Sequence, residues 1–163
     1  MDNPLLTLRE QGYEIVIRDM NAGDLIVGYF GHGSVTQWGQ DNLLTVNGTA
    51  ALTDSVRLPL VINMTCLTGL FTHPKVQSLA EALLWKPDGG AVAVLAPTSL
   101  TLPADQSFLS RPLVEFFLKN RNVPLGDILL QAQRTVPIQD AGLQDVLRTF
   151  LLFGDPALKL LQP

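Results

Sequence analysis

The chain has 163 residues, of which 47% are hydrophobic and 16% are charged, and its formal net charge is −4. This length suits one domain with a sizeable core, which we assign to residues 1–163. Lys and Arg are spread along the chain, which argues against nucleic-acid binding because that function normally needs a basic patch. No apolar run is long enough to span a membrane and the first residues do not resemble a signal peptide, so we expect no membrane association.

Three continuous apolar runs bounded by turn residues predict strands that are buried on both faces, as in parallel sheets. These runs are residues 25–30, 60–64 and 91–96. Two further strands are expected, one at the β-branched residues 13–17 and one at residues 157–161.

Helices are expected where apolar residues recur every three or four positions. The predicted helices are residues 5–10, 76–85, 105–120, 125–135 and 143–153. Residues 38–54 are rich in Gly, Asn, Thr and Asp, which indicates an ordered loop with a short helix. Because strands and helices alternate, the pattern predicts a mostly parallel sheet in a three-layer α/β sandwich, with the three apolar strands as neighbours.

Two of the apolar runs end in residues that are useful for catalysis. His32 follows the first run between Gly31 and Gly33, and Cys66, the only cysteine, follows the second. The carboxyl ends of parallel strands meet at the edge of the sheet where ligands bind. A thiolate there can attack a carbonyl carbon while an imidazole takes up and returns the proton. The pair therefore predicts nucleophilic acyl transfer, against the general expectation that a lone cysteine is a small buried hydrophobic residue.

Several motifs extend this pattern along nearly the whole chain. They are residues 28–34 with Trp38, Cys66 with Gly69 and Phe71, and residues 78–83, 90–93 and 153–158. Together and in this order they resemble the gingipain-like cysteine peptidases, which have a caspase-like fold. The resemblance is more specific than any one of the motifs.

The resemblance implies that His32 is the catalytic histidine and Cys66 the nucleophile of a cysteine-type endopeptidase that acts through an acyl-enzyme. It implies a peptide or protein substrate, no cofactor, and a secreted or cell-surface location. A transpeptidase in surface-protein attachment, which resolves the same acyl-enzyme with an amine, is one alternative. A non-catalytic caspase-like scaffold is the other.

The chain differs from the family at its amino-terminal end. Family catalytic domains have further strands and an acidic residue before the segment with which this sequence starts. We therefore expect an amino-terminally truncated domain with a third catalytic residue still to be identified. An open edge of the sheet is also expected, and an upstream segment or a second copy of the chain would cover it.

Other residues near the predicted site have two interpretations each. The backbone N–H groups of Gly33 and Cys66 are the expected oxyanion donors, although the glycine also suits a tight turn. Thr98 and Ser99 either line a substrate pocket or cap a turn, and Trp38 either packs in the core or forms a wall of the cleft.

Metal and serine chemistry are poorly supported by the sequence. His73 is expected to be a loop residue at a helix start. Together with His32 and Cys66 it fits no common zinc spacing, so no metal site is predicted. The chain has no Gly-x-Ser-x-Gly motif, which argues against a serine hydrolase.

Overall fold

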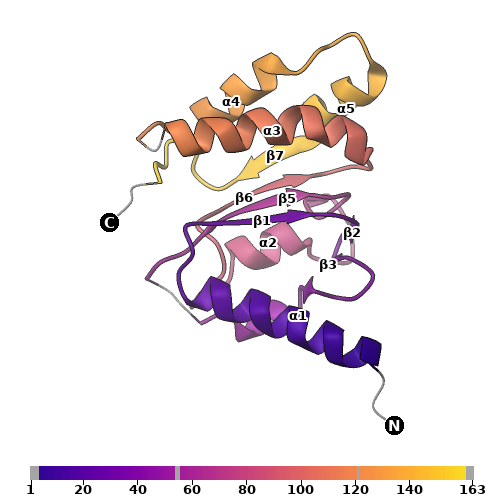
Figure 1. Ribbon diagram of the computed structural model, residues 1–163, viewed down its shortest axis with the longest axis vertical. Helices are drawn as coiled ribbons and strands as arrows, with labels where there is room; N and C mark the ends of the chain where they lie inside the picture. The colour runs from indigo at the N-terminus through magenta and orange to yellow at the C-terminus, as the bar shows by residue number, and fades with distance from the viewer. Residues whose placement is uncertain (1–3, 54–55, 121, 161–163) are drawn as a thin grey trace.

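A four-stranded sheet lies at the centre of the computed structural model, which describes residues 4–53, 56–120 and 122–160, with side chains in the first helix described from residue 10 (Figure 1). In spatial order its strands are β1 (Ile26–Phe30), β5 (Leu60–Met64), β6 (Ala93–Pro97) and β7 (Phe150–Phe153). The first three are parallel, and β7 is antiparallel to β6. The three predicted strands are therefore neighbours, as expected. The prediction that all three are buried on both faces is wrong for β1, which is only partly buried because it lies at the edge of the sheet, with Phe30 58% exposed.

Helices cover both faces of this sheet, which confirms the three-layer arrangement (Figure 1). One face packs against α3 (Pro103–Lys119), α4 (Leu125–Thr135) and α5 (Ala141–Thr149). The other packs against α1 (Pro4–Asn21) and α2 (Leu79–Leu84). On this second side also lie a short 3₁₀-helix and a small antiparallel sheet: η1 (Gly48–Ala51), β2 (Gly33–Ser34), β3 (Gln37–Trp38) and β4 (Leu44–Thr45).

The central strand β5 is buried along its whole length and separates two hydrophobic cores. Leu60, Ile62 and Met64 belong to the core beneath α3, α4 and α5. Val61 points to the other side, where it joins the core that contains Trp38. Burial on both faces explains why the strand reads as a continuous apolar run.

The predicted strand at residues 13–17 is wrong, because α1 continues through Gly12 to Asn21. Val16, Ile17 and Met20 lie at helical spacing and pack together into the core on the α2 side of the sheet. In a strand, Val16 and Ile17 would point to opposite faces. Burial of one helix face therefore overrides the β propensity of these residues.

The predictions for the carboxyl-terminal part are also partly wrong. The helix expected at residues 143–153 ends at Thr149, and the next four residues form β7 along β6. Short apolar runs such as this one fit either structure until their partners are known. Residues 157–160 form no strand, because the Leu158 carbonyl accepts a hydrogen bond from the Leu125 N–H and so holds the segment against the start of α4. Residue 161 lies outside the described part.

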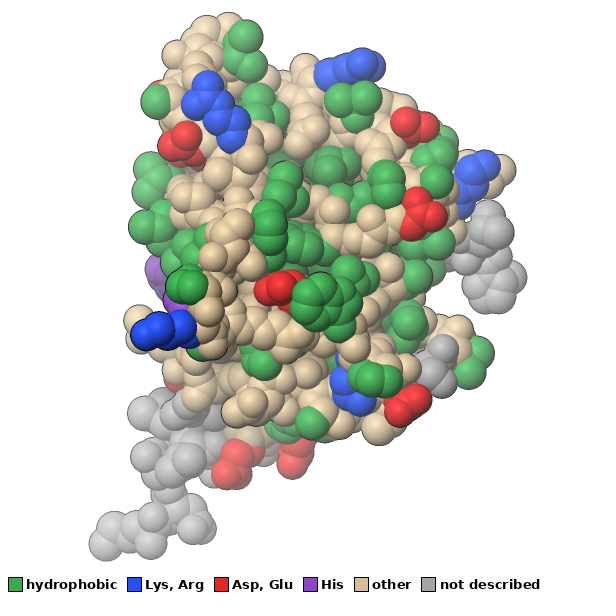
Figure 2. All heavy atoms as spheres, turned by 180° about the vertical axis from the view of Figure 1, so that it is seen from behind, with side chains coloured by type: hydrophobic (Ala, Val, Ile, Leu, Met, Phe, Trp, Pro, Cys, Tyr) green, Lys and Arg blue, Asp and Glu red, His purple; other side chains and the backbone are tan. Residues whose placement is uncertain are grey.

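Two surface properties bear on partners. On the face seen from behind, Lys and Arg lie at separate places with hydrophobic side chains between them (Figure 2). In the described ranges, no helix is both long and apolar enough to cross a membrane.

Candidate active site

The register of β1 and β5 brings the His32 and Cys66 segments side by side. Phe30 is paired with Met64 at the carboxyl ends of these parallel strands, and each candidate residue follows its strand at the same distance along the chain. The Gly31 N–H donates to the Met64 carbonyl at 3.1 Å, which extends the pairing beyond the strands. The two candidate residues therefore occupy matching positions on adjacent strand ends.

Gly33 allows the histidine loop to approach the cysteine turn closely. A Cβ atom at this position would lie 2.8 Å from the Thr65 Cβ, 3.0 Å from the Thr68 Cγ2 and 3.1 Å from the Cys66 carbonyl oxygen. The first of these distances is shorter than real Cβ contacts allow. The glycine is therefore required for close packing of the two segments, in addition to any role in the turn.

The hairpin formed by β2 and β3 determines whether the N–H of Gly33, the predicted oxyanion donor, takes part in strand pairing. Gly33 is paired with Trp38, and the Gly39 N–H donates to the His32 carbonyl at 2.7 Å. This bond joins the residues that flank the pair, so Gly33 and Trp38 face each other without a hydrogen bond between them. In such an antiparallel pair the two facing residues do not use their own N–H groups in the ladder. The Gly33 N–H is thus outside the hydrogen bonds of the hairpin, as an oxyanion donor needs to be.

The backbone at His32 is held by a second donor, while its side chain is exposed. The Tyr29 hydroxyl donates to the His32 carbonyl at 3.1 Å, and the Tyr29 ring stacks on Trp38 with centroids 4.7 Å apart. Burial, and secondarily the negative charge of Asp41, raise the pKa of Tyr29. The hydroxyl therefore stays protonated and able to donate to a higher pH than the ordinary pKa value of 10.0 would allow.

Cys66 is half-buried at the start of a strained turn. Its Sγ donates to the Thr101 carbonyl at 3.3 Å. The next residue, Leu67, has φ +60°, a conformation that is unfavourable for a side chain, and its N–H donates to the Ser99 carbonyl at 3.2 Å. Such outliers persist where the surrounding structure fixes them, and they cluster at functional sites.

The loop after β6 thus lies against the cysteine turn, and two residues predicted to line a substrate pocket are in it. Ser99 contacts the turn through its carbonyl, as described above. Thr98 is directed elsewhere, since its hydroxyl and its N–H both bond to the Thr149 carbonyl, at 3.1 and 2.9 Å. Only Ser99 is placed beside Cys66 by these contacts, and the substrate role of both residues stays a prediction.

Trp38 is a core residue, which agrees with the first of its two interpretations, packing in the core, and not with a wall of the cleft. Its side chain is 1% exposed. The indole Nε1 donates to the Asn63 Oδ1 at 2.8 Å, and the ring stacks on Tyr29. It supports the histidine loop from beneath and offers no surface to a substrate.

His73 lies in a loop before α2, as expected. Its Nδ1 accepts hydrogen bonds from the Lys75 N–H at 3.3 Å and the Val76 N–H at 3.1 Å. This bonding indicates a structural role within the loop. Among the described residues there is no group of three or more His, Cys, Asp and Glu side chains that could hold a metal ion.

Sequence reasoning missed the polar residues that fix the two loops to each other. Thr101 accepts the thiol hydrogen bond through its carbonyl, and Gln106, in the first turn of α3, donates to the Thr65 carbonyl at 2.7 Å. Gln106 is 5% exposed. Its only signal in the sequence is an uncharged polar residue at the start of a predicted helix, which is too common to identify a site.

Comparison with known proteins agrees with this arrangement. The profile of peptidase family C25 matches residues 6–161. Gingipain R2 of Porphyromonas gingivalis is 31% identical over 152 residues, which cover 88% of this chain and 20% of the relative. Gingipain R1 of the same organism is 32% identical over 154 residues, which cover 88% of this chain and 15% of the relative. The chain therefore spans a fifth or less of the length of these relatives.

Two solved structures are also similar. A complex of the pro- and mature domains of Porphyromonas gingivalis RgpB matches with a TM-score of 0.81 and 26% identity, covering 90% of this chain and 36% of that one. The crystal structure of the Arg specific cysteine proteinase gingipain R matches with a TM-score of 0.75 and 28% identity, covering 90% and 35%. The predicted gingipain-like, caspase-like α/β fold is confirmed.

Proposed function

Because the chain belongs to peptidase family C25, we propose that it carries the nucleophile and the histidine of a cysteine endopeptidase, Cys66 and His32. The observation that supports this most strongly is the register of β1 and β5, which sets these residues at matching positions on adjacent strand ends. The strained Cys66–Leu67 turn and the close approach of Gly33 add to it.

In the proposed mechanism the Cys66 sulfur attacks the carbonyl carbon of the scissile peptide bond. The thiol proton passes to His32, which gives it to the leaving amine as the carbon–nitrogen bond breaks. Water, deprotonated by His32, then attacks the thioester, which releases the carboxylic acid and restores the thiol. The N–H groups of Gly33 and Cys66 stabilise the negative charge on the tetrahedral oxygen.

The substrate of this reaction is a peptide or protein segment, and Ser99 forms one side of its binding site, whereas Thr98 bonds to the Thr149 carbonyl and holds the loop. The position of Ser99 supports this, because its carbonyl bonds to the turn that holds Cys66. The two exposed leucines of the same loop, Leu100 and Leu102, lie on either side of the residue that accepts the thiol hydrogen bond. A secreted or cell-surface location is proposed on the family resemblance.

A covalent probe tests the function directly. A peptidyl acyloxymethyl ketone should label the protein at Cys66, as determined by mass spectrometry, and Cys66→Ala and His32→Ala should each lose the label. Thr53→Ala, in the loop after η1, is a matched surface control that should label like the parent. Equal labelling of His32→Ala and the parent would contradict the dyad, and a parent that does not label would support a scaffold.

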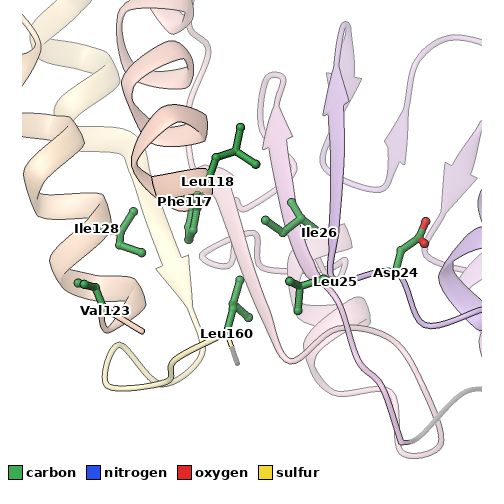
Figure 3. A pocket seen from close by; sticks show the side chains of 8 residues that line it. All are labelled: Asp24, Leu25, Ile26, Phe117, Leu118, Val123, Ile128 and Leu160. Carbon is green, nitrogen blue, oxygen red and sulfur yellow. The ribbon is translucent and has the colours of Figure 1, made fainter. Parts of the chain in front are cut away.

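We also propose that the open edge of the sheet is covered in the whole protein, by another segment of the same polypeptide or by a second copy. Strand β1 lies at this edge of the described sheet. Beside it is a hollow of about 380 Å³ (Figure 3), lined by Asp24, Leu25, Ile26, Phe117, Leu118, Val123, Ile128 and Leu160. Open strand edges and apolar hollows favour contact with another polypeptide.

Hydrogen exchange distinguishes the two partners. Amides of residues 26–30 that become protected only at high protein concentration would indicate a second copy. Protection that appears only in a longer polypeptide would indicate a segment of the same chain. Equal exchange under all of these conditions would contradict the coverage.

A further inference from the structure

The buried amide of Gln106 joins the two loops that meet at Cys66. Gln106 is 5% exposed, and its Nε2 donates to the Thr65 carbonyl at 2.7 Å and to the Thr101 Oγ1 at 2.8 Å. Thr65 directly precedes the nucleophile on the β5 side, whereas Thr101 belongs to the loop after β6. One side-chain amide group therefore uses both of its hydrogens, one on each loop.

Thr101 continues this connection to the reactive atom. Its Oγ1 donates to the same Thr65 carbonyl at 3.3 Å, and its own carbonyl accepts from the Cys66 Sγ at 3.3 Å. Thr65 is fixed from a further side, because its hydroxyl lies 2.8 Å from the Thr68 hydroxyl. The Thr65 carbonyl, Thr101 and Gln106 are therefore all hydrogen-bonded to one another. The Thr101 carbonyl connects this network to the Cys66 thiol.

We propose that Gln106 is a positioning residue for Cys66 in the reaction proposed above, and this inference rests on that proposed function. Gln106 acts through Thr65 and Thr101 without touching the substrate. Buried hydrogen bonds of this kind hold a unique geometry because their donors and acceptors have no water with which to exchange. A nucleophile displaced by about 1 Å loses about 100-fold in rate, so fixing the loops affects the chemical step.

The test separates positioning from binding by measuring probe inactivation at a series of concentrations, which gives the rate constant kinact and the binding constant KI. Gln106→Leu keeps the approximate volume and removes both donors. We expect kinact to fall about tenfold or more while KI changes by less than about threefold. Gln144→Leu is the matched control, because Gln144 on α5 also donates through Nε2 to a backbone carbonyl, that of Ile138, at 2.8 Å.

A second pair of variants keeps the test informative if Gln106→Leu does not fold, which circular dichroism shows. Thr101→Val removes the hydroxyl that joins Gln106 to Thr65 and keeps the shape, whereas Thr101→Ser keeps a hydroxyl. We expect kinact to fall more in Thr101→Val than in Thr101→Ser. Where Gln106→Leu does fold, it should have a smaller additional effect in the Thr101→Val background than in the parent, because the residues act in one network.

The outcomes distinguish this inference from the function on which it rests. A parent that the peptidyl probe does not label contradicts both. A labelled parent with an unchanged kinact in folded Gln106→Leu overturns the positioning role alone, as does a loss that falls only on KI. Equal kinact values for Thr101→Val and Thr101→Ser also overturn it.

Discussion

The two faces of β5 differ in chemistry although they belong to one strand. Toward α3 the strand buries Leu60, Ile62 and Met64 among aliphatic and aromatic side chains. Toward Trp38 it buries Asn63, which is 0% exposed and accepts the indole hydrogen bond. The Nδ2 atom of Asn63 is buried without a hydrogen-bond partner in the described part of the chain.

The two faces therefore contribute differently, one to the stability of the fold and the other to the orientation of the histidine loop. Apolar burial is non-directional and scales with area, so the β5 side chains that face α3 stabilise the fold without fixing the orientation of any one group. Hydrogen bonds on the other side require particular distances and angles, and they support Tyr29 and the histidine loop. Substitutions of the apolar β5 side chains that face α3 should therefore change stability more than reactivity, and those near the histidine loop should change both.

The largest effect on stability is expected from Ile62→Ala on the α3 side. Ile62 is 2% exposed, and its truncation should lower the free energy of unfolding by about 2–5 kcal/mol in urea titrations. The labelling rate of the folded fraction at Cys66 should remain close to that of the parent. A large loss of labelling in folded Ile62→Ala would show that the two faces are not separable in this way.

Gly33→Ala should lower both stability and reactivity. The added Cβ would meet the Thr65 Cβ at 2.8 Å, which forces the two loops apart and costs about 1–3 kcal/mol. Gly28→Ala is the matched control on the neighbouring strand, where the new atom meets only the ring of the exposed Phe30, at 3.2 Å for the nearest atom. Equal stability and equal labelling of the two variants would contradict the close approach at Gly33.

Trp38→Phe should cost about 1–3 kcal/mol, because it leaves the Asn63 Oδ1 buried without its donor. Adding Asn63→Leu removes the unpaired amide altogether, so the double variant should be more stable than Trp38→Phe alone. Chemical denaturation of the four proteins in this cycle measures the difference. A double variant that is less stable than Trp38→Phe would show that the amide contributes in another way.

Tyr29 should give the smallest effect, visible at high pH. Its pKa is raised above the ordinary value of 10.0 by burial and then by Asp41, so the folded protein holds the hydroxyl proton more tightly than the unfolded chain. The corresponding stability is present below pH 10.0 and is lost as the pH rises through the folded pKa. The stability of Tyr29→Phe should therefore fall less between pH 9 and about 11 than that of the parent. Parallel curves would contradict this contribution.

Much of the fold could be predicted because its central strands are buried on both faces and read as continuous apolar runs. The sequence was less informative about segments whose structure depends on the neighbour that they pack against or pair with. Residues 13–17 are β-branched but follow the helical spacing of α1, and residues 150–153 form a strand only because β6 offers an edge. The two-residue strands β2, β3 and β4 are too short to show any period.

The candidate site was predictable to the same extent. His32 and Cys66 could be found because each follows a continuous apolar run, and their strands proved to be neighbours. Gln106 and Thr101 could not, because their importance depends on how the loop after β6 folds back onto the cysteine turn. Trp38 was assigned partly to the cleft because its burial and its bond to Asn63 cannot be inferred from its distance in sequence to His32.

The most direct test of the account is the rate at which iodoacetamide alkylates Cys66, measured against pH for the parent and for His32→Ala. Cys66 is the only cysteine, so mass spectrometry of the intact protein reports on this site alone. If His32 activates the thiol, the parent should react rapidly near neutral pH and His32→Ala about tenfold or more slowly, with its fold intact. Identical slow profiles, with reaction only on unfolding, would contradict the catalytic pair and leave a structural cysteine.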